Sequence, residues 1–224
     1  MNAEEAIIKC EIALKQIKQY DPEPSYVSYF FDQYITSLNN IIEGIFEGVN
    51  RDFGLFVEQI SEEKIYEKAK MKNDENAIKF LEWYSEKYIE EHKNPYPGFI
   101  NKIHSFRNKF ERLPEIKIMI RASDRYKDDI NQEIKINLNN QKLRSRDELN
   151  IEIRRQLPIF LEVINHKRHE QNEPKVEEKQ IVASAFTSIE NYQDMEIAYS
   201  AEIYIPVMKR LVEESRKKIQ ELIR

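Results

Sequence analysis

The amino-acid sequence predicts a mainly α-helical α+β protein, in which a helical bundle carries a β-hairpin insertion. Three observations predict this class. Long segments repeat apolar residues every three or four positions, as amphipathic helices do. The 224 residues include only four glycines and eight prolines, which suits long helices better than a sandwich with many tight turns. One short region instead alternates apolar and polar residues, which is the period of a β-strand.

We expect a single domain over residues 1–224. Within it, residues 1–113 make a helical bundle part, 114–142 the β-hairpin and 143–224 a C-terminal helical part. A chain of this length can bury a substantial core. Its 33% charged and 11% aromatic residues are not typical of a disordered chain.

The bundle is organised around residues 25–49, the most aromatic segment of the chain. Its spacing predicts a long helix with one buried stripe, formed by Val27, Phe31, Tyr34, Leu38, Ile41 or Ile42, Ile45 and Val49. A second row, Tyr26, Tyr29, Phe30 and Phe46, widens the apolar surface, so we expect neighbours on more than one side. Gly44 and Gly48 favour either the close approach of another helix or local fraying.

The flanking helices are marked by their caps and breakers. A first helix, capped by Asn2, should end near Tyr20, because prolines follow at 22 and 24. Ser61 is expected to cap a short helix that ends near Met71, and Asn73 or Asp74 the next one. After a loop at 92–98, residues 99–113 form a further amphipathic helix that Pro114 ends.

Residues 115–138 change to a period of two, which predicts two strands. Ile116, Ile118 and Ile120 alternate with Glu115, Lys117, Met119 and Arg121, and Ile134, Ile136 and Leu138 alternate with Glu133, Lys135 and Asn137. The polar residues 123–129 suit a hairpin connection. Since two strands alone are marginally stable, the apolar faces must pack on helices or find a third strand.

The C-terminal part reads mainly as helix. Ser145 and Glu148 match a capping box at the start of a helix that Pro158 either kinks or divides. Residues 176–192 are interpreted as helix, with 181–187 as the alternative third strand. A last helix should run from about Met195 to the end, with Pro206 as a kink or a fresh start.

Composition excludes several function classes. The net charge of −5 disfavours a nucleic-acid footprint over the whole protein. The single cysteine, Cys10, rules out an internal disulfide and is interpreted as a small buried residue. No apolar run is long enough to span a membrane, and the N-terminus does not resemble a signal peptide, so we expect a cytoplasmic protein without a membrane partner. No metal cluster, nucleophile triad or phosphate loop is evident, and no cofactor is expected.

Residues 104–109, His-Ser-Phe-Arg-Asn-Lys, carry the most suggestive polar constellation. Over residues 25–113 the chain resembles the HEPN superfamily of helical bundles, whose ribonuclease members carry an arginine, a polar residue and then a histidine. The resemblance implies that Arg107 holds a phosphate and that a histidine moves protons in a cleft between two subunits. Arg107 and Asn108 match the first half of this motif. Glu111, Arg112 and Leu113 stand where the histidine is expected, and His104 precedes the arginine.

We therefore expect a non-catalytic, HEPN-like binding or regulatory protein that forms a homodimer and binds RNA or a protein. The alternative is a divergent metal-independent ribonuclease that uses Arg107, Asn108 and His104. A purely structural role is also open, in which Arg107 pairs with Glu111 one helical turn away.

Two further groups of residues resemble parts of metal sites. Glu115-Ile-Lys117 and Glu133-Ile-Lys135, with Asp124, Asp128 and Asp129 nearby, resemble fragments of metal-dependent nucleases, although charged alternating strands produce such triplets freely. His166 and His169 lack an evident third zinc ligand.

The densest cationic set offers candidate phosphate contacts. It comprises Lys142, Arg144, Arg146, Arg154 and Arg155. Such residues can touch phosphate. Because Asp147, Glu148 and Glu152 are interleaved with them, an ion-paired helix surface is the alternative.

Overall fold

The computed structural model describes residues 3–123, 136–138 and 145–224, and it confirms the mainly helical α+β class. Its helices are α1 (Ala3–Tyr20), α2 (Pro24–Asp52), α3 (Glu62–Lys72), α4 (Glu75–Glu91), α5 (Pro95–Phe110), α6 (Arg146–Glu170) and α7 (Ile197–Ile223). A short 3-10 turn spans Glu178–Gln180. The strands are β1 (Ile116–Ala122), β2 (Ile136–Leu138), β3 (Ile181–Ile189) and β4 (Tyr192–Glu196).

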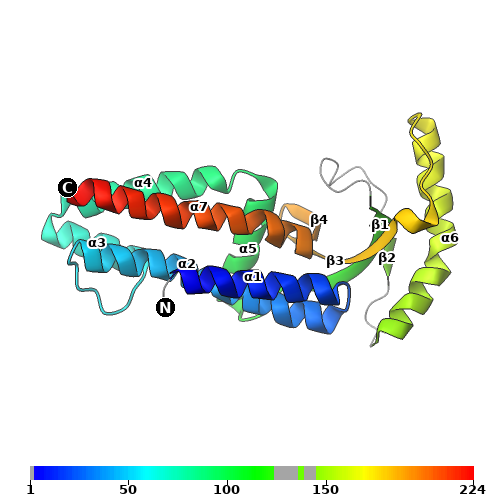
Figure 1. The fold of residues 1–224 in the computed structure, drawn as a ribbon, viewed down its shortest axis with the longest axis horizontal. Coiled ribbons are helices and arrows are strands. Elements are labelled where there is room, and N and C mark those ends of the chain that lie inside the picture. The colour runs from blue at the N-terminus through cyan, green and yellow to red at the C-terminus, as the bar shows by residue number, and fades with distance from the viewer. Residues whose placement is uncertain (1–2, 124–135, 139–144) are drawn as a thin grey trace.

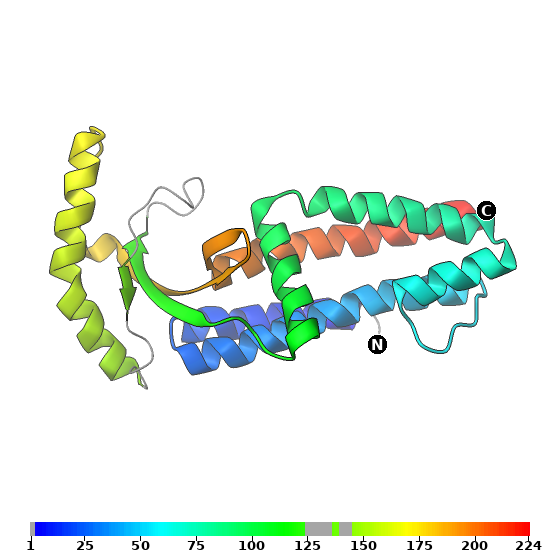
Figure 2. The ribbon, with the colours of Figure 1, turned by 180° about the vertical axis from the view of Figure 1, so that it is seen from behind.

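The helices form an elongated bundle with a small sheet at one end (Figure 1). Helices α1, α2, α3, α4 and α7 run along its length, while α5 crosses them, as the view from behind shows (Figure 2). Helix α6 lies beyond the sheet, on the side away from the bundle, and the C-terminus lies at the opposite end of the bundle.

Helix α2 is the central helix that the periodicity predicts. Its stripe from Val27 to Val49 is buried, with Phe31 and Tyr34 fully enclosed. The second aromatic row is divided: Phe46 is buried, but Tyr26 and Tyr29 are 50% and 60% exposed. Neighbouring helices therefore cover only part of the aromatic surface.

Helix α1 packs closely along α2, and Gly44 permits this approach. A side-chain carbon on Gly44 would lie 2.8 Å from the backbone nitrogen of Ala3, whereas Gly48 has open space beside it. Cys10 is buried in the same contact, where its thiol lies 3.7 Å from the carbonyl oxygen of Tyr34. Burial raises the pKa of Cys10 to about 12, so the thiol stays protonated.

The predicted helix caps form, but the two prolines inside the C-terminal part do not begin new helices. Side-chain oxygens of Ser61, Asp74 and Ser145 accept hydrogen bonds from backbone N–H groups in the first turns of α3, α4 and α6, as expected. Pro158 and Pro206, in contrast, lie inside the continuous helices α6 and α7, so neither begins a new helix.

The predicted hairpin is confirmed and belongs to a larger antiparallel sheet of order β2-β1-β3-β4. Ile118 lies opposite Leu138, and Ile120 lies opposite Ile136. Ile134 and the connection after Ser123 lie outside the described residues. The opposite face of β1 is also buried, since Met119 and Arg121 are only 5% and 4% exposed.

The helix predicted over residues 176–192 is wrong, because the middle of this segment is strand β3. It pairs antiparallel with β1, with Ala185 opposite Ile118, and a turn leads on to β4. The physical reason is the free edge of β1: β2 spans three residues, so β1 needs a longer partner to satisfy its backbone. This long-range pairing overrides the helical spacing of Val182, Phe186 and Ile189.

The sheet separates two hydrophobic cores. The larger fills the bundle, and the smaller lies between the sheet and α6. The buried members of the smaller core are Ile118, Ile120, Ala122, Leu138, Leu149, Phe160, Ile164 and Val176.

Charged groups are buried where the sheet joins the bundle. Arg121 donates from Nε to Oε2 of Glu196 at 2.9 Å, and both side chains are at least nine-tenths buried. Asp21, in the turn between α1 and α2, accepts a hydrogen bond from the Ala185 N–H at 2.7 Å. Burial, followed by the charge of Glu196, raises the pKa of Asp21 to about 7, although bonds from Ala185 and Ser184 and the charge of Arg121 oppose this.

Asp21 should therefore make stability depend on pH. An unfolded aspartate titrates near 3.8 and the folded one near 7, so the folded state holds the proton more tightly. The stability that Asp21 contributes is complete below about pH 4 and is lost as the pH rises through about 7.

Asp21→Asn keeps the acceptor for Ala185 but cannot ionise. We expect its free energy of unfolding, measured in urea between pH 4 and 8, to fall less with pH than that of the wild type. The exposed Asp52→Asn variant serves as control. Parallel wild-type and Asp21→Asn curves would contradict this account of the Asp21 carboxyl.

Candidate functional site

Helix α5 brings the sequence-predicted residues against α2. Arg107 donates from Nε to Oδ1 of Asp32 at 3.1 Å, and its side chain is 32% exposed. Nε2 of His104 lies 3.3 Å from Oδ1 of Asn39. The proposed pairing of Arg107 with Glu111 is not found: Glu111 ends α5 in a left-handed conformation with φ of 55°, which takes it off the helical face.

His104 is held as a neutral imidazole. Burial, followed by the charges of Arg107 and His92, lowers its pKa to about 4. Its Nε2 atom also lies 3.1 Å from Nδ2 of Asn108. A nitrogen of a neutral imidazole ring either donates or accepts a hydrogen bond. Nε2 can therefore donate to Oδ1 of Asn39 or accept from Nδ2 of Asn108, but it cannot do both.

We call Asp32, Asn39, His104, Arg107 and Asn108 the interhelical seam. His104 and Arg107 lie three positions apart on α5, and the charge of Arg107 reaches the His104 ring. A base with so low a pKa is weak near neutral pH, and Arg107 already holds a carboxylate. The seam is thus built to join α2 to α5, and only part of the guanidinium remains available to a phosphate.

Three of the candidate phosphate contacts, Arg146, Arg154 and Arg155, lie on α6. Arg146 pairs with Glu23 at 3.5 Å. Arg155 forms two hydrogen bonds to Glu152, at 2.9 and 2.6 Å, which matches the ion-paired alternative. Arg154 is exposed, and Lys142 and Arg144 lie outside the described residues.

The metal-site candidates find little support in the described part of the chain. No three His, Cys, Asp or Glu side chains there come close enough together to hold a metal ion. His166 faces Glu170 at 3.4 Å, one helical turn on. Asp124, Asp128, Asp129, Glu133 and Lys135 lie outside the described residues.

Four aromatic rings gather where α1 turns into α2, and we call them the aromatic corner: Tyr20, Tyr26, Tyr29 and Phe30. Tyr20 stacks on Tyr26 and on Phe30, with ring centroids 4.6 and 5.7 Å apart. Tyr29 meets Phe30 edge-on at 5.2 Å. The corner lies at the sheet end of the bundle (Figure 1). Glu23, which lies between Tyr20 and Tyr26 in the chain, pairs with Arg146 of α6.

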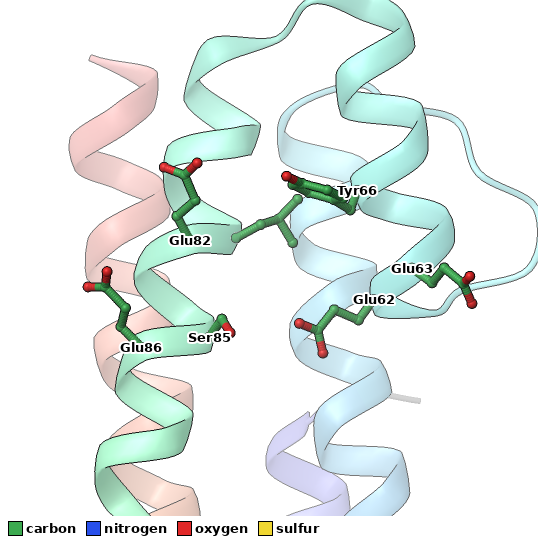
Figure 3. Close-up of a pocket in the computed structure, with 7 residues that line it drawn as sticks. Glu62, Glu63, Tyr66, Glu82, Ser85 and Glu86 are labelled. Atoms are coloured by element: carbon green, nitrogen blue, oxygen red, sulfur yellow. The ribbon is translucent and has the colours of Figure 1, made fainter.

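A groove of about 590 Å³ lies between α3 and α4 near the other end of the bundle, and we call it the acidic groove. Its lining residues are Glu62, Glu63, Tyr66, Leu81, Glu82, Ser85 and Glu86. Glu62 extends from α3 toward Ser85, whereas Glu82 and Glu86 lie along the far flank of α4 (Figure 3). Glu82 and Glu86 are one helical turn apart in the sequence, but only packing of α3 beside α4 forms the groove.

Comparison with protein-family models, curated proteins and solved structures finds no match to this chain. The resemblance to the HEPN superfamily therefore stays a prediction from the sequence. Among the described residues, no helix combines the length and the hydrophobicity needed to cross a membrane.

Proposed function

We propose that this chain is a non-catalytic binding protein that forms a homodimer through the aromatic corner. The observation that carries the proposal is the exposure of Tyr26 and Tyr29, which are 50% and 60% accessible within a continuous group of rings. Contiguous exposed aromatic surface marks interaction sites, and tyrosine is enriched among residues that dominate binding energy.

A second copy suits this surface because the corner has charges of both signs beside it. Glu23 and Arg146 pair at 3.5 Å, and Arg146 remains 59% exposed at its side chain. In a two-fold interface the same patch meets itself, so each glutamate can face the arginine of the other copy. Such an arrangement covers the rings without leaving a buried charge unpaired.

Binding rather than catalysis is supported by the interhelical seam. Cleavage of RNA without a metal needs one group that removes the 2′ proton and another that protonates the leaving oxygen. Arg107 supplies only charge stabilisation, and the low pKa of His104 makes it a poor carrier of protons near pH 7.

Sedimentation of the purified protein at about 10–100 μM tests the dimer. We expect a dimeric mass for the wild type and a shift toward monomer for Tyr26→Ser/Tyr29→Ser, with affinity lowered at least about tenfold. Ile8→Ser/Ile12→Ser removes two similarly exposed apolar side chains from α1 and should stay dimeric. A monomeric wild type across this range would reject the dimer.

RNA is the other ligand that stacked rings can accept. We expect no cleavage of labelled single-stranded RNA in chelator by the wild type or by the Arg107→Ala and His104→Ala variants. Wild-type cleavage that disappears in either variant would establish a divergent ribonuclease. RNA binding that is lost in Tyr26→Ser/Tyr29→Ser, without any dimer, would assign the corner to RNA instead.

A further inference from the structure

Phe56 is held on the surface in a backbone conformation that a bulky residue rarely adopts. It lies in the loop between α2 and α3, its φ is 59°, and it is 81% exposed. A left-handed φ costs free energy for a residue with a large side chain, whereas asparagine and glycine tolerate it. Because so exposed a ring gains little from packing, the stability of the fold does not explain why phenylalanine occupies this position.

Hydrogen bonds on both sides of Phe56 fix the loop. The Asn50 side chain donates from Nδ2 to the carbonyl oxygen of Val57 at 2.9 Å and accepts from the Val57 N–H at 2.8 Å. The Leu55 N–H donates to the carbonyl oxygen of Asn50 at 2.9 Å, and the Leu55 side chain is fully buried. The ring is therefore presented in a defined place, so binding through it requires little further ordering of the chain.

A row of three lysines on α3 lies beside this loop, namely Lys64, Lys68 and Lys72. Lys72 places its ammonium 4.8 Å from the centroid of the Phe56 ring and donates to the carbonyl oxygen of Gly54 at 2.6 Å. Lys64 donates to Oε1 of Gln59, which also belongs to the loop. Lys68 lies between the other two, one helical turn from each, so the row repeats about every 6 Å along the helix.

The positive charge of this row is not neutralised within the protein. In the part of the chain that the structure describes, none of the three lysines pairs with a carboxylate. Glu63 and Glu67 each precede a lysine of the row by one position, about 100° around the helix, so they face another side of α3. The loop side of α3 thus carries a strip of positive charge next to an exposed ring.

Met71 adds a second exposed apolar side chain. It lies in the last turn of α3, next to Lys72 in the chain, and is 77% exposed. Phenylalanine and methionine are both enriched at protein interfaces, and the unbranched thioether adapts to the shape of a partner. We call Phe56, Met71 and the three lysines the α3 surface. Helix α3 lies toward the end of the bundle away from the sheet (Figure 1).

We propose that the α3 surface binds an acidic amphipathic helix of a protein partner. This inference rests on the proposed binding function and names the chemistry of the partner. Carboxylates one turn apart on such a helix repeat at the same step as the lysines, because both helices rise about 1.5 Å per residue. The acidic row faces the lysines, and the apolar side chains of the partner cover Phe56 and Met71.

Single-stranded RNA suits this surface less well. An exposed ring beside lysines can stack a base, but a nucleic-acid footprint usually has an excess of positive charge. The whole chain has a net charge of −5, and residues 51–73 contain five basic and five acidic residues. A polyanion that carries charge on every side meets these carboxylates as well, whereas a helix with one acidic row meets only the lysines.

Fluorescence anisotropy with a labelled synthetic helix of leucine and glutamate tests the proposal. We expect saturable binding that weakens as salt rises. Phe56→Asn should lower the affinity at least about tenfold, because the contact with the ring is lost. Lys68→Gln/Lys72→Gln should lower it about fivefold. Phe110→Asn is the matched control, since Phe110 is 48% exposed with the Lys109 ammonium 5.1 Å from its centroid, and it should bind like the wild type.

Phe56→Asn also distinguishes a binding role of the ring from a structural one. Asparagine tolerates the left-handed backbone at this position, so we expect the variant to unfold in urea at or above the wild-type midpoint. A clearly lower midpoint would show that the ring stabilises the loop and would overturn the proposal.

Three results of the binding experiment would also overturn it. These are equal affinity of the wild type and Phe56→Asn, absence of wild-type binding to the acidic helix, and binding of labelled oligouridine without binding of the helix. A peptide with glutamine in place of glutamate should bind at least about fivefold more weakly. Tyr26→Ser/Tyr29→Ser should keep the acidic helix and Phe56→Asn should keep the dimer, so either proposal can fail alone.

Discussion

Replacing Arg121 with methionine is expected to lower the free energy of unfolding by about 3–5 kcal/mol at pH 7. The substitution keeps much of the apolar stem but removes the charge that faces Glu196 at 2.8 Å. Glu196 is only 9% exposed, so its carboxylate would remain buried without a cation. The pKa of Asp21 would rise further, because the charge of Arg121 is one of the influences that lower it.

A double variant distinguishes the loss of the Arg121–Glu196 contact from the cost of leaving Glu196 buried and charged without Arg121. Arg121→Met/Glu196→Gln removes both charges, and we expect urea unfolding to show it as more stable than Arg121→Met alone. Arg154→Met, on the exposed side of α6, should change stability by no more than about 0.5 kcal/mol. If Arg121→Met is as stable as the wild type, the Arg121–Glu196 pair is accessible to water in solution.

The same junction shows why the sheet could be predicted only in part. The alternation of Ile116, Ile118 and Ile120 identifies β1, because period two is a local property of the chain. The partner β3 begins at Ile181, 59 positions after β1 ends at Ala122. Nothing within residues 176–192 shows that this segment pairs with β1 as a strand and does not form a buried helix. The alternation also does not reveal that Arg121 is buried, because its partner Glu196 lies 75 residues away in sequence.

The candidate site could likewise be predicted only in part. That His104, Arg107 and Asn108 share one region of α5 follows from their spacing. Their partners Asp32 and Asn39 come from α2 and depend on how the two helices cross. The acidic groove was missed for the same reason, since α3 and α4 supply its lining residues and form a groove only through tertiary packing.

Leu38→Ala should cost about 2–5 kcal/mol of unfolding free energy, and Ile41→Ala a similar amount. The two side chains are 2% and 1% exposed on the stripe of α2, so each truncation removes buried methyl groups and leaves a cavity in the larger core. Close packing in the interior limits how far neighbouring side chains can relax into that space.

The exposed Ile151→Ala variant on α6 provides the control, since Ile151 is 67% accessible and its truncation should cost no more than about 0.5 kcal/mol. Urea unfolding followed by circular dichroism compares the three variants at equal pH and protein concentration. If Leu38→Ala and Ile41→Ala both unfold at the wild-type midpoint, α2 does not lie at the centre of the bundle. A loss confined to these two variants establishes that its buried stripe holds the remaining helices together.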